Sequence, residues 1–215
     1  MAAYGSGMAR NLAEAVDAVA AIDPVMAALI EQHGPPILGG RRKGRTRFEE
    51  LAESICYQQL AGKAAESIWR RVKAAVGDDF TPEAVLAAGF DPLRGAGFSR
   101  AKAESVLDLA AKVHSGEVRL ERIGRLDDAA VVKELTVVRG IGPWTAEMFL
   151  IFTLQRLDVW PIGDYGVRAG YAKAYGLAEM PTPKELHVLG DRFSPYRTVA
   201  AWYCWRAVST VTPSS

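Results

Sequence analysis

The 215-residue sequence has few of the residues that build metal centres or covalent frameworks. Its two cysteines, Cys56 and Cys204, are too few for a disulfide framework and too far apart for a Cys-x-x-Cys metal site. The three histidines, His33, His114 and His187, lack the spacing of metal ligands. These absences favour a reduced intracellular protein that needs neither zinc nor an iron–sulfur cluster.

Long hydrophobic runs and a strong charge imbalance are also missing. No window of eighteen apolar residues occurs, so we expect no membrane span. The N-terminal stretch MAAYGSGMARNLAEAV has no basic start followed by an apolar run, so we expect no secretory signal. The net charge is only +1, and composition alone therefore does not indicate a nucleic-acid-binding protein. Apolar residues make up 49% of the chain, enough to bury the core of one domain or of two lobes.

Strand patterns are scarce as well, because alternating β-branched runs are nearly absent and alanine is abundant. The segment VVKELTVV could form a strand, but its spacing also fits the last turns of a helix. We therefore predict an all-α fold of roughly nine to eleven short helices. Four pairs of a capping side chain and a proline predict helix starts: Asp23-Pro24, Thr81-Pro82, Thr182-Pro183 and Ser194-Pro195.

Other caps divide the middle of the chain. Thr46 and Glu49 are spaced as a capping box that opens the apolar-periodic run 48–76. Ser99 is expected to cap a helix that stops at Gly116, and Asp127 or Asp128 a helix that leads to Val138. Between these helices, the Asp91-Pro92 pair is expected to open only a short turn.

Residues 138–150, VRGIGPWTAEMFL, interrupt this helical pattern. Gly140 can close one helix with a positive φ, Ile141 can anchor in the core, and Pro143 can start the next helix. Gly142 leaves room for a phosphate to reach the unpaired N–H groups of that next helix. A bare Gly-x-Gly between helices favours an ordinary αα-hairpin, but the extended pattern L-x-x-V-x-G-I-G-x-x-T-A is more demanding.

This extended pattern resembles the helix-hairpin-helix of the HhH-GPD superfamily of DNA glycosylases. Within that superfamily the sequence is most similar to the AlkA-like DNA-3-methyladenine glycosylase II branch, in a compact form. The resemblance spans residues 48–206 and rests on ICYQQLAGKAAESIW, GFSRAKAESVLDLA, VRGIGPWTAEMFL, PIGDYGVRAGY and SPYRTVAAWYCWRA.

The resemblance implies an all-α fold of two helical lobes with the active-site cleft between them. N-terminal helices (1–47) would pack with the C-terminal lobe. A central lobe (48–160) would end in the hairpin, at about 130–154. The C-terminal lobe (161–215) would carry the catalytic aspartate.

That aspartate is Asp164, which stands 22 positions after Gly142 and directly before a predicted helix. Asp164 is also expected to be the N-cap of that helix, and the two roles are compatible because a capped carboxylate is held beside fixed dipoles. The substrates implied are alkylated purines, whose positively charged base is already a good leaving group. One carboxylate would then suffice, in contrast to the pair that glycosidases use.

Bifunctional relatives carry a nucleophilic lysine two residues after the second hairpin glycine, where this sequence has Trp144. An indole cannot form a Schiff base, so the resemblance implies a monofunctional enzyme without lyase activity. Relatives with an iron–sulfur cluster carry four C-terminal cysteines, whereas only Cys204 is present in this region. The expected reaction is hydrolysis of the N-glycosidic bond of 3-methyladenine- or 7-methylguanine-type bases, which leaves an abasic site.

By position, the aromatic residues that would line the base pocket are Trp144, Tyr165 and Trp205, since electron-rich rings attract a cationic base. The alternative for each is a core aromatic residue, which is what we expect of Trp202 and Tyr203. The width of the pocket would depend on further side chains: Tyr57, Phe98 and Met148.

The turn Gln58, Gln59, Leu60 matches the family loop that enters the duplex when a base is flipped out, with Gln59 or Leu60 as the wedge. The alternative, given equal weight, is that Leu60 lies in the core and the glutamines cap a helix. Further DNA contacts are expected at Lys63, Arg139, Gly140, Gly142 and Thr145. Lys63, Arg100 and Lys102 open helices near the expected DNA face. The densest basic cluster comprises Arg41, Arg42, Lys43, Arg45 and Arg47, and a solvated loop is its favoured interpretation.

In this family the hairpin often binds a monovalent cation, Na+ or K+, through backbone carbonyls, which by position would be those of Thr136, Val138 and Ile141. No other cofactor is expected. The expected partner is double-stranded DNA with alkylated bases, and the expected state is a monomer in the cytoplasm, on the nucleoid of a bacterium or in the nucleus of a eukaryote. Two alternatives remain: a non-catalytic DNA-binding hairpin protein, and a related glycosylase that acts on uracil or deaminated bases.

Overall fold

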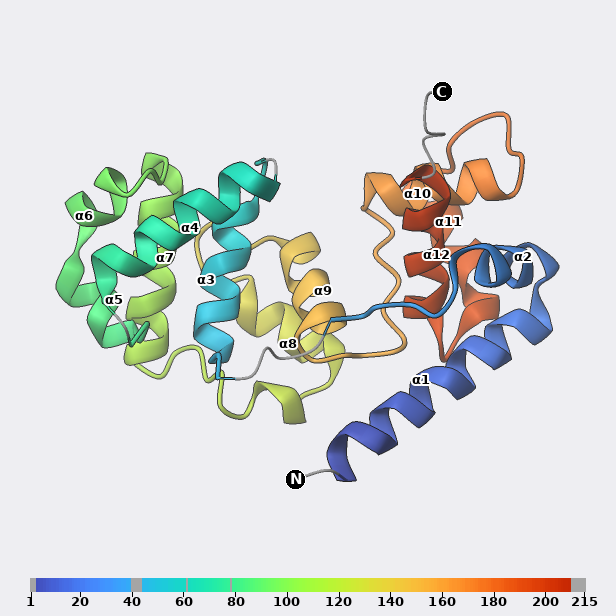
Figure 1. The fold of residues 1–215 in the computed structure, drawn as a ribbon, viewed down its shortest axis with the longest axis horizontal. Helices are drawn as coiled ribbons and strands as arrows, with labels where there is room; N and C mark the ends of the chain where they lie inside the picture. The colour runs from blue at the N-terminus through green and yellow to red at the C-terminus, as the bar shows by residue number, and fades with distance from the viewer. Residues whose placement is uncertain (1–2, 40–43, 61, 78, 210–215) are drawn as a thin grey trace. The chain divides into compact units, whose positions relative to one another are not determined.

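The computed structural model describes residues 3–39, 44–60, 62–77 and 79–209, and it contains twelve α-helices and two short 3-10 helices within those ranges (Figure 1). No strand occurs in these ranges, as predicted. The chain divides into two compact units, one formed by residues 1–39 and 155–215 and the other by residues 40–154. No helix within the described ranges is long and apolar enough to cross a membrane.

The first unit contains α1 (Ala3–Ile22), α2 (Pro24–His33), α10 (Tyr165–Ala174), α11 (Pro183–Gly190), the 3-10 helix η2 (Asp191–Phe193) and α12 (Arg197–Ser209). Its core includes Met26, Val167, Tyr171, Phe193 and Tyr203, so both ends of the sequence contribute to one hydrophobic cluster. Helices α10 and α12 pack closely along much of their length.

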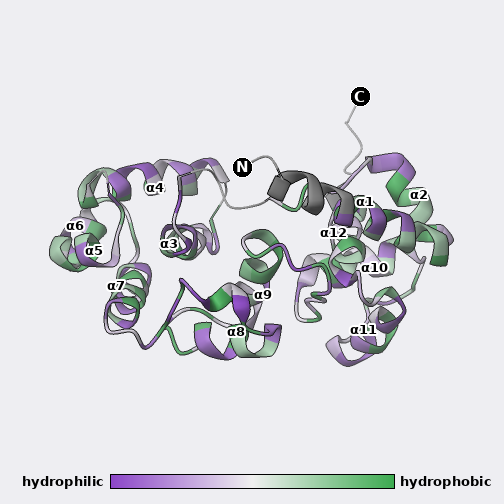
Figure 2. Ribbon diagram, turned by 90° about the horizontal axis from the view of Figure 1, so that it is seen from below, coloured by the Kyte–Doolittle hydropathy of each residue, from purple (hydrophilic) through white to green (hydrophobic). Residues whose placement is uncertain are grey.

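The second unit contains α3 (Arg47–Tyr57), α4 (Gly62–Val76), α5 (Pro82–Ala88), α6 (Phe90–Gly95), α7 (Arg100–His114), the 3-10 helix η1 (Ile123–Arg125), α8 (Asp128–Leu135) and α9 (Pro143–Phe152). Helix α4 is amphipathic, with Ala65, Trp69 and Val72 buried at helical spacing. Hydrophobic residues dominate α9 (Figure 2), and Phe149, Leu150 and Ile151 are buried. In the other helix of the hairpin, α8, Val131 and Leu135 are buried, so both helices of the hairpin rest on a packed core.

Most of the predicted caps are confirmed. Asp23, Thr46, Thr81, Ser99, Asp127 and Thr182 each accept a hydrogen bond from the backbone N–H three residues on. The reciprocal capping box is present at Thr182 with Glu185. These contacts explain why each helix begins where the sequence placed it.

Three local predictions are wrong. The Ser194-Pro195 pair does not start a helix: α12 begins at Arg197, and the Ser194 hydroxyl instead donates to Asp158. Residues 90–95 form α6 rather than a turn. Gly89 is both the C-cap of α5 and the N-cap of α6, so the second helix follows the first directly. The helix before the hairpin ends at Leu135, not near Val138, and a tight turn in which the Val138 N–H donates to Leu135 follows it.

The two units meet in the sequence at 39/40 and 154/155, whereas the sequence placed boundaries at 47/48 and 160/161. Arg47 belongs with the second unit because its guanidinium donates to the carbonyls of Leu120 and Glu121. At the other boundary, Thr198 on α12 bonds the backbone of Leu157 and Val159, which draws this segment into the first unit.

Candidate functional site

The turn between α8 and α9 has the conformation that its two glycines suggested. Gly140 has φ +76°, and a Cβ there would clash with the Oγ of Ser105 on α7. Ile141 is buried, as predicted for a core anchor. Gly142 has φ −91° and open space where a Cβ would lie. The two glycines therefore have different roles: Gly140 is required by the fold, and Gly142 leaves one side of the turn open.

Helix α9 begins at Pro143 without a side-chain cap, because Gly142 is its N-cap residue. An uncapped N-terminus carries partial positive charge from the helix dipole and from N–H groups that lack helical partners. Together with the open side of Gly142, this end of α9 has the electrostatics and the access that a phosphate requires.

The turn after α3 is tied to the hairpin. The side-chain amide of Gln58 donates to the Gly140 carbonyl at 3.0 Å and to the Thr145 hydroxyl at 3.1 Å. Gln59 has φ +57° and is exposed, and Leu60 is 38% exposed. The alternative that Leu60 lies in the core is wrong, because the turn projects Gln59 and Leu60 outward while Gln58 faces the hairpin.

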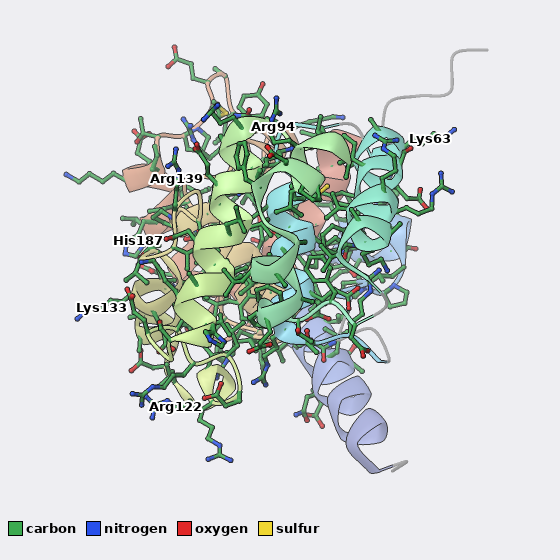
Figure 3. All side chains as sticks on the ribbon, turned by 90° about the vertical axis from the view of Figure 1, so that its left-hand side faces the viewer. Lys63, Arg94, Arg122, Lys133, Arg139 and His187 are labelled. Atoms are coloured by element: carbon green, nitrogen blue, oxygen red, sulfur yellow. The ribbon has the colours of Figure 1, made fainter. Side chains whose placement is uncertain are left out.

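The remaining candidates for DNA binding lie in different surroundings. Lys63, in the first turn of α4, is exposed and extends outward (Figure 3). The Arg139 guanidinium pairs with Glu104 at 2.6 Å, and its backbone N–H donates to Asp108 at 2.7 Å. Thr145 is buried and accepts the bond from Gln58. Thr145 therefore supports the turn from inside.

Asp164 occupies the N-cap of α10 and is 8% exposed. Its Oδ1 accepts two hydrogen bonds of 2.8 Å, one from the Val167 backbone N–H and one from the Trp205 indole N–H. Gly166 makes this arrangement possible, since a Cβ there would lie 2.8 Å from Trp205 Cδ1 and 3.1 Å from Asp164 Oδ1. The carboxylate is thus held by a helix end and by an aromatic ring on a different helix.

The aromatic candidates lie on both units. Tyr165 is 73% exposed next to Asp164, and Trp205 is half-buried beside the same carboxylate. On the hairpin unit, Trp144 is 45% exposed in the first turn of α9, whereas Tyr57 and Met148 are half-buried. The side chains of Trp144 and Tyr165 are thus both exposed. Phe98 is buried in the core, where it cannot set the width of a pocket, and Tyr203 is buried as predicted.

The carbonyls suggested for a monovalent cation belong to the hairpin turn. Thr136 is the C-cap of α8, and the Val138 carbonyl accepts the Ile141 N–H at 3.1 Å. A carbonyl oxygen has a second lone pair, so this bond leaves the Val138 oxygen able to bind a cation. Within the described ranges, no group of three or more His, Cys, Asp and Glu residues could hold a metal ion.

The basic candidates around residue 45 and on α7 make internal contacts. Arg41, Arg42 and Lys43 lie outside the described residues. Arg45 pairs with Glu53 and Glu49, and Arg47 bonds backbone carbonyls as described above. The Lys102 ammonium, expected near a DNA face, points inward and donates to the carbonyls of Cys56 and Gln58.

Sequence reasoning missed two supporting residues, Ser105 and Gly166. Their roles depend on contacts with chain segments that are distant in sequence: Ser105 meets Gly140, and Gly166 makes room for Trp205. The only sequence signal at this position was that Gly166 lies inside a predicted helix. A glycine inside a helix is often there because close packing leaves no room for a side chain.

Known proteins resemble this chain over most of its length. The family described as "HhH-GPD superfamily base excision DNA repair protein" matches residues 52–193. The DNA-3-methyladenine glycosylase 1 of Schizosaccharomyces pombe is 38% identical over 162 residues, which cover 74% of this chain and 71% of that protein.

Two solved structures have a similar fold. A Schizosaccharomyces pombe 3-methyladenine DNA glycosylase in complex with abasic DNA has a TM-score of 0.83 at 31% identity, covering 94% of this chain and 100% of that one. A DNA-3-methyladenine glycosidase from Bacillus halodurans has a TM-score of 0.80 at 36% identity, covering 91% and 89% of the two chains.

Proposed function

Because the chain belongs to the HhH-GPD superfamily of base excision DNA repair proteins, we propose that it is a monofunctional DNA glycosylase for alkylated purines. It flips the damaged nucleotide out of the duplex and hydrolyses the N-glycosidic bond of 3-methyladenine- or 7-methylguanine-type bases. The product is an abasic site, which other base-excision repair enzymes process. The observation that carries the proposal is the fixed Asp164 carboxylate beside Trp205.

The reaction requires little of the protein beyond this carboxylate. When the glycosidic bond of an alkylated purine breaks, both bonding electrons go to the cationic base, which leaves as a neutral molecule. Positive charge then develops on the sugar, and a carboxylate that is already oriented stabilises it without reorganisation. Asp164 supplies that charge, and it also orients the water that attacks the sugar. Its Oδ1 is held by the two N–H donors.

The aromatic residues select the substrate. A cationic base is attracted to an electron-rich ring by about 0.5–2 kcal/mol per contact. The exposed rings of Trp144 and Tyr165, with Trp205, are the candidates for this contact. Tyr57 and Met148 are further candidates for lining the base pocket. A neutral base such as uracil would gain less from these rings, and this difference favours alkylated purines over deaminated bases.

Trp144 also limits the chemistry. It stands two residues after Gly142, where an amine would be needed to attack the sugar and form a Schiff base. An indole nitrogen is not nucleophilic, so the enzyme has no lyase activity by this route.

DNA binding is assigned to the hairpin and to the turn after α3. The uncapped start of α9 and the open side of Gly142 receive a backbone phosphate, a contact that positions DNA without reading its sequence. Gln59 or Leu60 enters the duplex and fills the space left by the flipped base. Lys63 adds positive charge along the same strand, whereas Arg139 adds charge there only when its ion pair with Glu104 opens. The carbonyls of Thr136, Val138 and Ile141 would hold a Na+ or K+ ion, which would supply positive charge beside the phosphate.

We propose further that the protein acts as a monomer, needs no other cofactor and works where genomic DNA lies: on the nucleoid of a bacterium or in the nucleus of a eukaryote. Its partner is double-stranded DNA that contains alkylated bases.

The catalytic assignment is tested by Asp164→Asn. An asparagine oxygen still accepts the N–H bonds that cap α10, but it carries no charge. We expect the single-turnover rate of base release from methylated duplex DNA to fall about 100-fold or more. The measurement is chromatography of released bases together with the count of alkali-labile sites.

Asp127→Asn is the matched control, since it makes the same change at the N-cap of α8 and should leave the rate unaltered. Full activity of Asp164→Asn would refute the role of Asp164. DNA binding by the wild type without any base release would favour the non-catalytic alternative. A borohydride-trapped adduct would contradict the monofunctional assignment.

A further inference from the structure

One face of α7 supports both parts of the proposed DNA-binding surface. Lys102, Ser105 and Asp108 follow one another at three-residue spacing, which places them along one side of the helix. Lys102 contacts the end of α3, while Ser105 and Asp108 contact the hairpin turn. None of the three reaches outward as a DNA ligand would.

The Lys102 contact is the least expected of these. Its ammonium donates to the Cys56 carbonyl at 2.6 Å and to the Gln58 carbonyl at 2.7 Å. Both carbonyls lie at the C-terminal end of α3, where the last carbonyls of a helix lack backbone partners and carry negative partial charge. Partial burial lowers the pKa of Lys102 because it penalises the charged form.

Gln58 continues the connection toward the hairpin. Its backbone carbonyl is held by Lys102, while its side-chain amide donates to the Gly140 carbonyl and to the Thr145 hydroxyl. Gln59 and Leu60, the wedge candidates, follow directly in the sequence. The orientation of the wedge is therefore fixed on one side by α7 and on the other by the hairpin.

The hairpin is held against the same helix. A Cβ at Gly140 would lie 2.3 Å from the Ser105 Oγ, and the Arg139 N–H donates to Asp108 at 2.7 Å. Because Ser105 and Asp108 share a face with Lys102, a single rigid element determines the spacing between the turn and the hairpin. A wedge and a phosphate site must keep a fixed spacing if both are to engage one duplex.

We propose that Lys102 is a positioning residue for base flipping: by holding the carbonyls of Cys56 and Gln58, it keeps the 58–60 turn at the distance from the hairpin that lets wedge insertion and phosphate binding occur together. This inference rests on the proposed function. It predicts a loss in the flipping and excision steps rather than in the affinity for undamaged DNA.

The test compares Lys102→Met, Lys102→Arg and the control Lys73→Met, a lysine on α4 that pairs with Glu49. Base release is measured at saturating enzyme on methylated duplex DNA. Flipping is measured by the fluorescence of 2-aminopurine placed next to a tetrahydrofuran abasic-site analogue, and affinity by anisotropy on undamaged duplex. Thermal unfolding identifies a temperature at which every variant is folded.

For Lys102→Met we expect the excision rate at saturating enzyme to fall about 100-fold, the loss typical of a misplaced reacting group. The 2-aminopurine signal should fall with it, while the affinity for undamaged DNA is retained. Lys102→Arg should restore part of both signals, since a guanidinium can donate to two carbonyls. Lys73→Met should match the wild type.

Gln58→Leu keeps the inference falsifiable if Lys102→Met fails to fold, because it breaks the same connection at its other end. It should show the same loss of flipping, and where the double variant folds, its loss should be smaller than the sum of the two single losses. Wild-type flipping in either single variant would overturn the inference. So would a Lys102→Met defect that affects only DNA affinity and makes the salt dependence of binding shallower, because that is the behaviour of a residue that contacts a phosphate.

Absence of base release by the wild type would refute the proposed function instead. The 2-aminopurine signal would then decide the positioning role by itself.

Discussion

A single carboxylate oxygen of Asp164 receives two N–H donors from different parts of the chain. The Val167 N–H comes from the helix that Asp164 caps, and the Trp205 indole comes from α12. The first bond would form at any aspartate N-cap. The second is specific to this fold, and it restricts rotation of the carboxylate. The placement of charge at Asp164 is thus a property of two helices.

Trp205→Phe tests the contribution of the indole N–H. The substitution keeps an aromatic face but removes the donor to Asp164. A hydrogen bond to a charged group contributes about 1.5–3 kcal/mol, so we expect the single-turnover excision rate to fall about 10-fold or more. The rate is measured on methylated duplex DNA.

Trp202→Phe is the matched control. Trp202 lies on the same helix and packs against Tyr203 without contacting the carboxylate. An equal loss in both variants would mean that α12 packing, rather than the bond to Asp164, controls the rate.

In the hairpin between α8 and α9, one glycine is needed for folding and the other is available for DNA binding. Gly140 adopts a positive φ, and its backbone lies close to the side chain of Ser105. Gly142 has an ordinary φ and faces open space. Although both glycines belong to the same motif, only the first is needed for the turn to fold.

We therefore expect opposite results from two alanine substitutions. Gly140→Ala should destabilise the protein by about 1–3 kcal/mol through its positive φ and the clash with Ser105, which lowers the melting temperature by about 2–12 °C. Gly142→Ala should leave the melting temperature unchanged but weaken binding to abasic duplex DNA. Thermal unfolding and fluorescence anisotropy measure the two effects.

The reverse pattern would contradict the assignment. A stable Gly140→Ala would mean that the turn tolerates a side chain. Unchanged DNA binding by Gly142→Ala would mean that the phosphate does not approach this side of the hairpin.

For the molecule as a whole, net charge does not explain DNA binding. The chain carries only +1, and Arg139, Arg100 and Lys112 are paired with carboxylates. Glu104 alone contacts Arg139 and Arg100. Backbone N–H groups can bind a phosphate without adding to the net charge. A modest net charge is therefore compatible with DNA binding.

Glu104→Gln should change this balance. It removes the partner of Arg139, so the free guanidinium can contact a phosphate and release an additional counterion. We expect tighter binding to duplex DNA at low salt and a slope of log K against log salt that is steeper by about 1. Binding is measured by anisotropy across a salt series.

Glu117→Gln is the control, since Glu117 pairs with Lys112 away from the hairpin. An unchanged slope for Glu104→Gln would mean that Arg139 does not reach the DNA backbone.

Local sequence signals located the helices well wherever a side chain caps a nearby backbone N–H. Thr81, Ser99 and Thr182 illustrate this, because all of the atoms involved lie within three residues. Ser194 failed for the opposite reason: its hydroxyl found Asp158, a partner 36 residues away. The early end of α8 was missed because the turn from Leu135 to Ile141 is fixed by contacts with α7.

The all-α fold, the hairpin, the N-cap position of Asp164 and the presence of Trp144 in place of a lysine could be read from the sequence, since these depend on local geometry and residue identity. The folded chain was needed to show that Trp205 donates to Asp164, that Gly166 leaves room for it, and that Lys102 turns inward to α3 instead of outward to DNA. Those contacts join residues from distant parts of the chain. The packing of whole helices fixes them, and spacing along the sequence carries no record of that packing.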